Sequence, residues 1–153
     1  MPAIDERLAE LGLAIPDVAA PVAAYVPAVV AGGLVYTAGQ LPFVDGSLPQ
    51  SGKVGAEVSP EIAKDLAAIC VLNALAAVKS AIGSLDRITR IVKVVGFVAS
   101  AESFTGQPSV VNGASELLVD IFGDAGRHAR SAVGVAVLPL DSPVEVEIIA
   151  EFA

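Results

Sequence analysis

The chain has 153 residues and a mass of 15.4 kDa, the size of one domain that can bury a core without disulfides or structural metal. Its 9 Lys and Arg against 17 Asp and Glu give a net charge of −8, which disfavours general nucleic-acid binding and attachment to anionic membranes. One cysteine and one histidine exclude a disulfide framework, a cysteine-based zinc site and a multi-histidine metal site within one chain.

The first twenty residues predict a short helix and an extended segment at the start of a single domain spanning residues 1–153. Ile4, Leu8 and Leu11 fall on one helical face that ends at Gly12, and the Pro- and Ala-rich residues 14–22 follow. No basic region precedes a hydrophobic run, so we expect no signal peptide. The uncharged residues 18–44 contain prolines and glycines that would break a membrane-spanning helix. We therefore predict a soluble, cytoplasmic protein.

A β-hairpin is predicted next, with strands at residues 25–31 and 34–38 around the turn signal Gly32-Gly33. Pro27 indicates that the first strand is partly an edge or begins late. Residues 45–58 have the composition of a surface loop.

A long helix is predicted over residues 60–82. Ser59-Pro60-Glu61 supplies an N-cap, a proline at the first helical position and an acid at the positive end of the dipole, and Gly83 ends the helix. The expected inner stripe is Ile62, Leu66, Ile69 and Leu72 or Asn73.

The second half of the chain predicts a buried strand at 88–99, a helix at 108–122 and strands at 129–138 and 144–152. The inward residues of this helix are expected to be Val111, Ala114, Leu118 and Ile121. The order β-β-α-β-α-β-β predicts an α+β domain whose single sheet carries two helices on one face.

The uncovered face of this sheet should be unusually apolar. Whichever alternate set of the strand at 129–138 lies on it is small or hydrophobic: Ala132, Gly134 and Ala136, or Ser131, Val133, Val135 and Val137. Only 17% of the residues are charged, so few charges are available to make such a face soluble. We therefore expect copies of the chain to associate through this sheet face and cover it.

The cysteine and the histidine favour structural roles. Cys70 lies in an apolar helical run, where a packed thiol is expected rather than a nucleophile. His128 precedes a strand and has no carboxylate partner that the sequence can name, which favours a surface or loop residue.

The charged residues of the last two strands admit two interpretations. Glu145 and Glu147 share one face of their strand, and Arg130 opens the preceding strand. If these strands pair as a hairpin, Arg130 and Glu145 lie near opposite ends of the ladder, so a site using both needs the sheet edge or a neighbouring subunit. Alternatively, the charges belong to a solvated edge and deter aggregation.

Four segments together resemble the Rid/YjgF family of reactive-intermediate (imine and enamine) deaminases, also described as L-PSP endoribonucleases. The family's entry hairpin is matched by Tyr25-Val26-Pro27-Ala28 and Val35-Tyr36-Thr37-Ala38-Gly39-Gln40-Leu41-Pro42. Its central strand is similar to Val94-Val95-Gly96-Phe97-Val98, and its C-terminal signature is similar to the strands around Arg130 and Glu145. The longer N-terminus and Val111-Asn112-Gly113-Ala114-Ser115 are similar to a longer-chain branch of the family.

The resemblance implies a chorismate-mutase-like fold assembled as a homotrimer, with a central barrel-like core and three clefts between subunits. Arg130 matches the arginine that holds the substrate carboxylate, a role that suits a bidentate guanidinium. Glu145 matches the glutamate that positions or activates the attacking water. Tyr25 matches the tyrosine lining the cleft, Gly39 the backbone that approaches the ligand, and Asn112 an asparagine of the second helix.

One position departs from the pattern of deaminating members, which read Thr-Ser-Gly-Gln where this chain has Thr37-Ala38-Gly39-Gln40. Ala38 lacks a hydroxyl that could contact substrate, a loss of about 0.5–1.5 kcal/mol that would redirect specificity without abolishing chemistry.

Three functions follow from the resemblance. The first is hydrolytic deamination of small 2-imino acids or their enamine tautomers, which needs no metal or organic cofactor because an imine is already electrophilic. The second is non-catalytic binding of a small carboxylate by the same trimer. The third is an endoribonuclease, against which the acidic balance and the single histidine argue.

Overall fold

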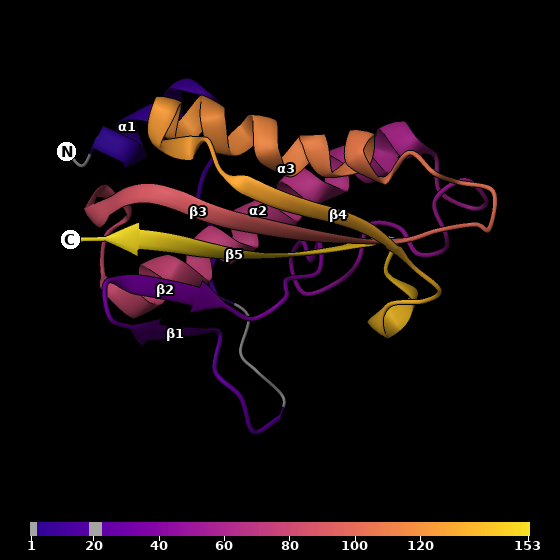
Figure 1. The fold of residues 1–153 in the computed structure, drawn as a ribbon, viewed down its shortest axis with the longest axis horizontal. Coiled ribbons are helices and arrows are strands. Elements are labelled where there is room, and N and C mark those ends of the chain that lie inside the picture. Colours follow the sequence, from indigo (N-terminus) through magenta and orange to yellow (C-terminus); the bar gives the residue numbers. More distant parts are fainter. Residues whose placement is uncertain (1–2, 19–22) are drawn as a thin grey trace.

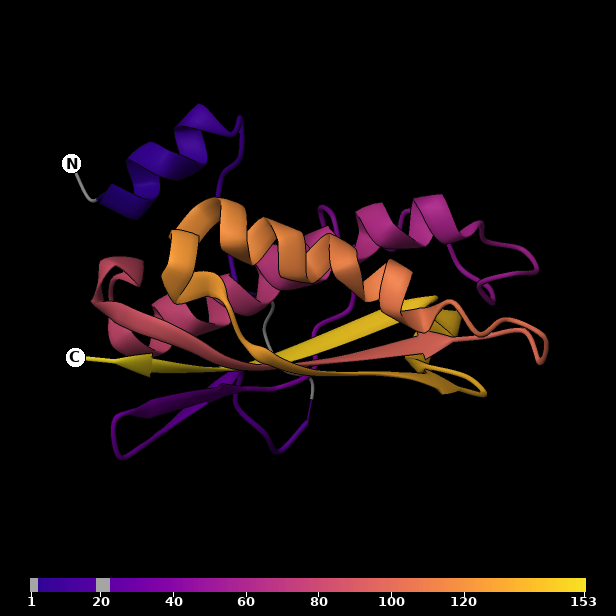
Figure 2. The ribbon, with the colours of Figure 1, turned by 45° about the horizontal axis from the view of Figure 1, so that its top comes forward.

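One five-stranded sheet carries two long helices on one face, as the computed structural model of residues 3–18 and 23–153 shows (Figure 1). A short N-terminal helix lies over the outer helix layer, on the same side of the sheet (Figure 2). The elements are α1 (Ala3–Glu10), β1 (Ala28–Ala31), β2 (Leu34–Thr37), α2 (Pro60–Ile82), β3 (Ile88–Ala99), α3 (Gln107–Phe122), β4 (Ala129–Val135) and β5 (Val144–Phe152). The predicted α+β class and element order are confirmed. Of the predicted extended segment at 14–22, residues 19–22 lie outside the described residues.

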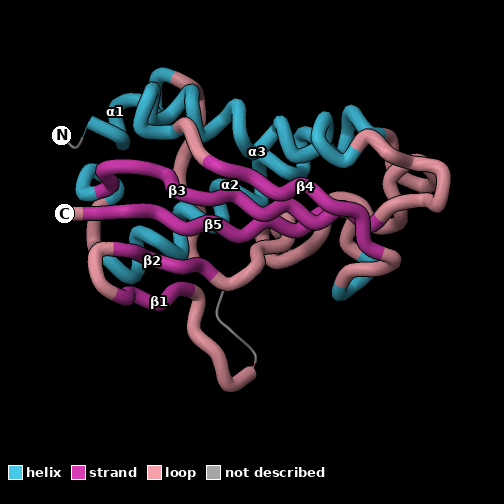
Figure 3. Tube along the Cα trace, viewed as in Figure 1, coloured by secondary structure: helices cyan, strands magenta, loops and turns pink. Residues whose placement is uncertain are grey.

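The strand order is β1-β2-β5-β3-β4, with β3 and β4 parallel and every other neighbouring pair antiparallel (Figure 3). The prediction that the last two strands pair as a hairpin is therefore wrong, because β3 lies between β4 and β5. Helix α3 connects β3 to β4 as a crossover, which brings β4 back parallel to β3. Strand β5 then runs on the other side of β3, where it pairs with β2 as well.

Helix α2 begins and ends where its capping residues predict. The Ser59 hydroxyl accepts a hydrogen bond from the amide of Ile62, and Gly83, at φ 88°, donates its amide to the Lys79 carbonyl. The predicted inner stripe is only partly right, because Leu66 and Asn73 are buried whereas Ile62 is 38% exposed. The helix is apolar on almost every side, so its periodicity does not single out one face.

The same helix is long and apolar enough to cross a membrane by length and composition. However, 61% of that window is buried in the fold, as in the core helix of a folded domain. The predicted cytoplasmic location stays a prediction.

Helix α3 buries all four residues predicted to face inward, which are Val111, Ala114, Leu118 and Ile121. It packs closely on both neighbours because two glycines leave room. A Cβ on Gly113 would collide with the carbonyl of Lys64 in α2, and one on Gly96 in β3 would stand 3.1 Å from Cβ of Val111.

The sheet face opposite the helices is open and of mixed character. Alternation places the buried residues of β3 and β5 on the helix side and their half-buried neighbours on this open face. The residues of β2, β3, β4 and β5 on this face include Tyr36, Lys93, Val95, Phe97, Val133, Glu145, Glu147 and Ile149. Val133 is 43% exposed and Tyr36 40%. Apolar residues therefore do remain uncovered, but charged ones interrupt them.

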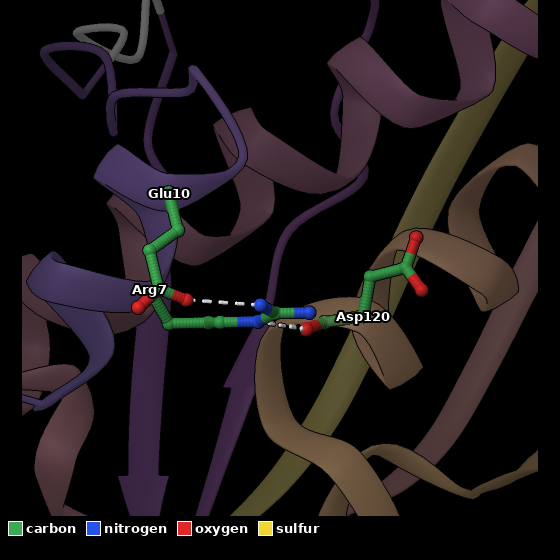
Figure 4. A network of polar contacts seen from close by, with 3 residues as sticks. All are labelled: Arg7, Glu10 and Asp120. Carbon is green, nitrogen blue, oxygen red and sulfur yellow. Dashed lines mark hydrogen bonds and ion pairs between the residues drawn. The ribbon is translucent and has the colours of Figure 1, made fainter.

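Polar contacts join the N-terminal helix to the rest of the fold, and Arg7 makes one of them (Figure 4). Arg7 donates from Nε to the carbonyl of Asp120 at 2.8 Å and from Nη1 to Glu10 at 3.0 Å. Asp120 lies in the last turn of α3, which has no basic residue of its own. Arg7 thus supplies the positive charge that a helix C-terminus favours.

Replacing Arg7 by alanine is expected to lower the free energy of unfolding by about 1 kcal/mol, because α3 loses a carbonyl partner and a favourable charge. Urea unfolding measures the difference, and Glu10→Ala, which removes only the exposed ion pair, should have a smaller effect. Equal stability of Arg7→Ala and the unchanged protein would show that α1 does not cap α3.

Candidate active site

Arg130 lies on edge strand β4 and extends toward helix α3. Its Nη1 donates to Asn112 Oδ1 at 2.8 Å and to Ser115 Oγ at 3.2 Å. The structure thus brings together Arg130 and Asn112, which the sequence assigned to one ligand. Among the described residues, Nε and Nη2 of Arg130 have no hydrogen-bond partner and no carboxylate within ion-pair distance. That edge of the guanidinium has the geometry that binds a carboxylate in a bidentate manner.

Glu145 lies on central strand β5 and contacts the turn after β2. A Cβ on Gly39 would overlap the Glu145 carboxylate and lie 2.9 Å from Cδ, so only glycine permits this carboxylate position. The two residues line one cavity of about 1060 Å³ together with Tyr25, which is 53% exposed. The other lining residues are mainly apolar or acidic, among them Leu41, Phe43, Leu140, Asp17 and Asp45. Ala38 does not line it; its amide donates to the carbonyl of Pro27.

These two groups of residues lie on opposite faces of the sheet. Arg130 pairs in register with Val94 of β3, whereas Glu145 pairs with Phe97, so strand β3 separates the two residues. The Arg130 side chain contacts α3 on the helix-covered face, and Glu145 lies on the open face. We call Arg130 with Asn112 the arginine half-site, and Glu145 with Gly39 and Tyr25 the glutamate half-site. One chain does not join them.

The sequence and the fold both match known proteins. A family profile described as "YjgF/chorismate_mutase-like, putative endoribonuclease" matches residues 5–152. The chain belongs to the Rid/YjgF family. Protein TCP17 of Trypanosoma cruzi is 42% identical over 146 residues, which are 95% of this chain and 91% of that protein.

Solved structures superimpose on most of this chain. Atu1372 from Agrobacterium tumefaciens, described as of unknown function, matches with a TM-score of 0.92 and 43% identity over 99% of this chain and 93% of its own. TdcF of E. coli, solved with bound serine, matches with a TM-score of 0.66 and 26% identity over 89% and 94%.

The environment of Glu145 makes its carboxyl a better proton acceptor than an exposed one. Burial raises the pKa of Glu145 above its ordinary value, and the negative charge of Glu147 on the same face raises the pKa further. A carboxylate with a raised pKa binds a proton more readily, which suits general-base chemistry near neutral pH.

Cys70 behaves as predicted for a packed thiol. It is fully buried in α2, and its Sγ lies 3.8 Å from the carbonyl of Val144. Burial raises the pKa of the Cys70 thiol well above its ordinary value, so the nucleophilic thiolate is disfavoured.

Sequence reasoning missed Ser115 and the contact that His128 makes with it. Ser115 follows Asn112 by three residues, which places both on one face of α3, and this spacing could have signalled that they contact the same partner. His128 lies in the loop before β4, as one of its two predicted placements had it, and is half-buried there. Its ring forms hydrogen bonds with Ser115 and with the carbonyl of Gly126. Its side-chain partner is a hydroxyl and not a carboxylate.

Clusters of metal-ligating side chains do not occur in the described part of the chain, where no three His, Cys, Asp or Glu residues come together.

Proposed function

We propose that this Rid/YjgF protein hydrolyses small 2-imino acids, or their enamine tautomers, to 2-keto acids and ammonia in clefts between subunits of a homotrimer. The observation that carries the proposal is the division of the site into two complementary half-sites on opposite faces of one sheet. The arginine half-site offers donors for a carboxylate and the glutamate half-site offers a proton acceptor. A neighbouring copy that brings its edge strand β4 to the glutamate half-site would complete the pair.

In the proposed reaction, Arg130 binds the substrate carboxylate and so orients the imine carbon toward a water held by Glu145. Glu145 accepts a proton as the water oxygen bonds to the C=N carbon, and the π electrons move to nitrogen. The protonated carboxyl then returns this proton to nitrogen, which gives an amino alcohol. Glu145 next takes the hydroxyl proton and delivers it to nitrogen as the C–N bond breaks and the C=O bond forms, so that nitrogen leaves as ammonia. Water and imine are thereby converted to keto acid and ammonia, and orientation supplies much of the rate.

Two further observations support a small ligand with a carboxylate. The guanidinium of Arg130 is held by neutral partners in the described structure, so its positive charge is available to an anion. The structurally similar TdcF was solved with serine, a small molecule that carries a carboxylate beside an amino group.

Non-catalytic binding of a small carboxylate is the second candidate, and Ala38 favours it. Ala38 stands where deaminating members usually have serine, so a hydroxyl that could contact substrate is missing. The arginine half-site would serve a binding protein equally well. A 2-keto acid that raises the melting temperature, without any imine turnover by the same preparation, would support this candidate.

Mixing two inactive variants tests the division of the site between subunits. Arg130→Ala and Glu145→Gln chains, unfolded together and refolded at equal amounts, should recover about one quarter of the wild-type rate of ammonia release. About three quarters of the trimers are then mixed, and each mixed trimer has one of its three clefts with both functional residues. Each variant refolded alone is the control, and no recovery in the mixture would contradict a shared site.

A further inference from the structure

We propose that Ser115 and His128 position Arg130 through one directed chain of hydrogen bonds. Arg130 Nη1 lies 3.2 Å from Ser115 Oγ, Ser115 Oγ lies 2.9 Å from His128 Nε2, and His128 Nδ1 lies 2.6 Å from the carbonyl oxygen of Gly126. The inference rests on the proposed function, because Arg130 is taken as the residue that binds the substrate carboxylate.

The two ends of the chain fix the direction of the outer hydrogen bonds, and a neutral His128 ring, which is part of the proposal, fixes the direction of the middle one. A guanidinium only donates, so Ser115 Oγ accepts from Arg130. A carbonyl only accepts, so Nδ1 of His128 carries the proton and donates to Gly126. In the neutral ring Nε2 is then the acceptor, and the Ser115 hydroxyl donates to it. Every donor in this chain therefore meets an acceptor.

Three backbone elements hold the residues of this hydrogen-bond chain in place. Ser115 is held by helix α3, and Arg130 by the parallel ladder of β4. Gly126 is buried in the short 3-10 turn that follows α3. A Cβ there would collide with the carbonyl of Leu118, so the backbone that presents the acceptor for His128 is tightly packed. The hydrogen bonds thus link the guanidinium to rigid backbone.

Neutral anchors suit a cation that must bind an anion. A carboxylate beside Arg130 would hold the guanidinium equally well but would neutralise it and compete with the ligand. Asn112, Ser115 and neutral His128 instead restrain a long and flexible side chain while leaving its charge for the substrate. Ser115 and His128 are positioning residues in this scheme, and neither contacts the substrate.

The single histidine allows a direct test that needs no turnover. ¹⁵N NMR of the ring should show a protonated Nδ1 and an unprotonated, hydrogen-bonded Nε2, and Ser115→Ala should shift the Nε2 resonance toward that of an unbonded acceptor. A proton on Nε2 in the wild-type protein, or no change in Ser115→Ala, would overturn the chain.

Kinetics with 2-iminobutanoate test what the chain does. Ser115→Ala and His128→Leu should each raise KM about tenfold with little change in kcat, because binding of the carboxylate weakens equally in the ground and transition states. His128→Gln, whose side-chain oxygen can accept from Ser115 in place of Nε2, should restore most of the affinity. Ser109→Ala, an exposed serine of the same helix, is the matched control.

The outcomes separate this inference from the proposed function. Unchanged KM in Ser115→Ala, or equal defects in His128→Gln and His128→Leu, would refute positioning even if the wild-type enzyme is active. If the wild-type protein hydrolyses no imine, the proposed function fails, and binding of 2-ketobutyrate then replaces KM as the readout. A roughly tenfold weaker 2-ketobutyrate affinity in Ser115→Ala would still uphold positioning, and unchanged affinity would refute it.

Discussion

Arg130→Ala is expected to lower kcat/KM for 2-iminopropanoate and 2-iminobutanoate by about a thousandfold while leaving the fold intact. The substrate carboxylate would lose both hydrogen bonds from the guanidinium, and with them the orientation of the imine carbon toward water. Release of ammonia and keto acid from freshly generated imines measures the loss. The fold should survive because Arg130 is on an edge strand and its partners Asn112 and Ser115 are only half-buried.

Arg127→Ala is the matched control for this variant. Arg127 lies three residues earlier, its side chain is 75% exposed, and its ion-pair partner is the exposed Asp124. It should keep full activity, whereas Arg130→Lys should be intermediate because lysine retains the charge but not the planar fork. Full activity in Arg130→Ala would refute the proposed mechanism.

Glu145→Gln is expected to lower kcat by about 10²–10⁴-fold with little change in KM, since glutamine cannot accept the proton of the attacking water. Steady-state kinetics with 2-iminobutanoate measure both constants. Glu147→Gln, two residues along the same strand and on the same face, is the control and should remain active at pH 7. Retention of wild-type kcat in Glu145→Gln would exclude Glu145 as the general base.

The raised pKa of Glu145 gives this prediction a pH dependence. Because the ionised carboxylate is the base, activity should fall as the pH drops through the pKa, at a higher pH than for an ordinary glutamate. Burial is the larger cause of the raised pKa and the charge of Glu147 the smaller. Glu147→Gln removes the charge of Glu147, so the fall in activity on the acid side of the pH–activity profile should move to lower pH.

The raised pKa of Glu145 also predicts how Glu145→Gln changes stability, so a loss of activity can be distinguished from a loss of folding. A carboxyl whose pKa is higher in the folded than in the unfolded state contributes stability below its unfolded pKa and loses that contribution as pH rises through its folded pKa. Glu145→Gln should therefore be more stable than the wild-type protein to urea at pH 7, with no difference in acid. Decreased stability of the variant at pH 7 would contradict the raised pKa.

Local signals were sufficient for the elements that carry their own boundaries. Helix α2 runs from Pro60 to Ile82 as predicted, because Ser59 caps it and Gly83 ends it. The strand at Val144–Phe152 was also predicted residue for residue, since alternation from Val144 to Ile148 followed by a β-branched and apolar run distinguishes it from its flanks. The segments that match the family are local as well, so they indicated it without any tertiary information.

Strand ends and pairing depended on distant residues. The strand predicted for residues 129–138 ends at Val135, because its partner β3 ends at Ala99, with which Val135 pairs. The first strand begins at Ala28 rather than Tyr25, consistent with the missing N–H of Pro27. No local signal indicates which strands will pair. The prediction therefore paired the two consecutive strands on either side of residues 139–143 as a hairpin, and this pairing was wrong.

The sequence by itself determined the family, the element order and six candidate site residues: Tyr25, Ala38, Gly39, Asn112, Arg130 and Glu145. The tertiary structure decided on which face each of them lies. A parallel crossover turned Arg130 toward α3, and the insertion of β5 between β2 and β3 left Glu145 on the open face. Side-chain direction in a strand alternates with register, and register is set by partners far away in the chain. The two half-sites and the hydrogen bonds through Ser115 and His128 therefore emerge only from the folded molecule.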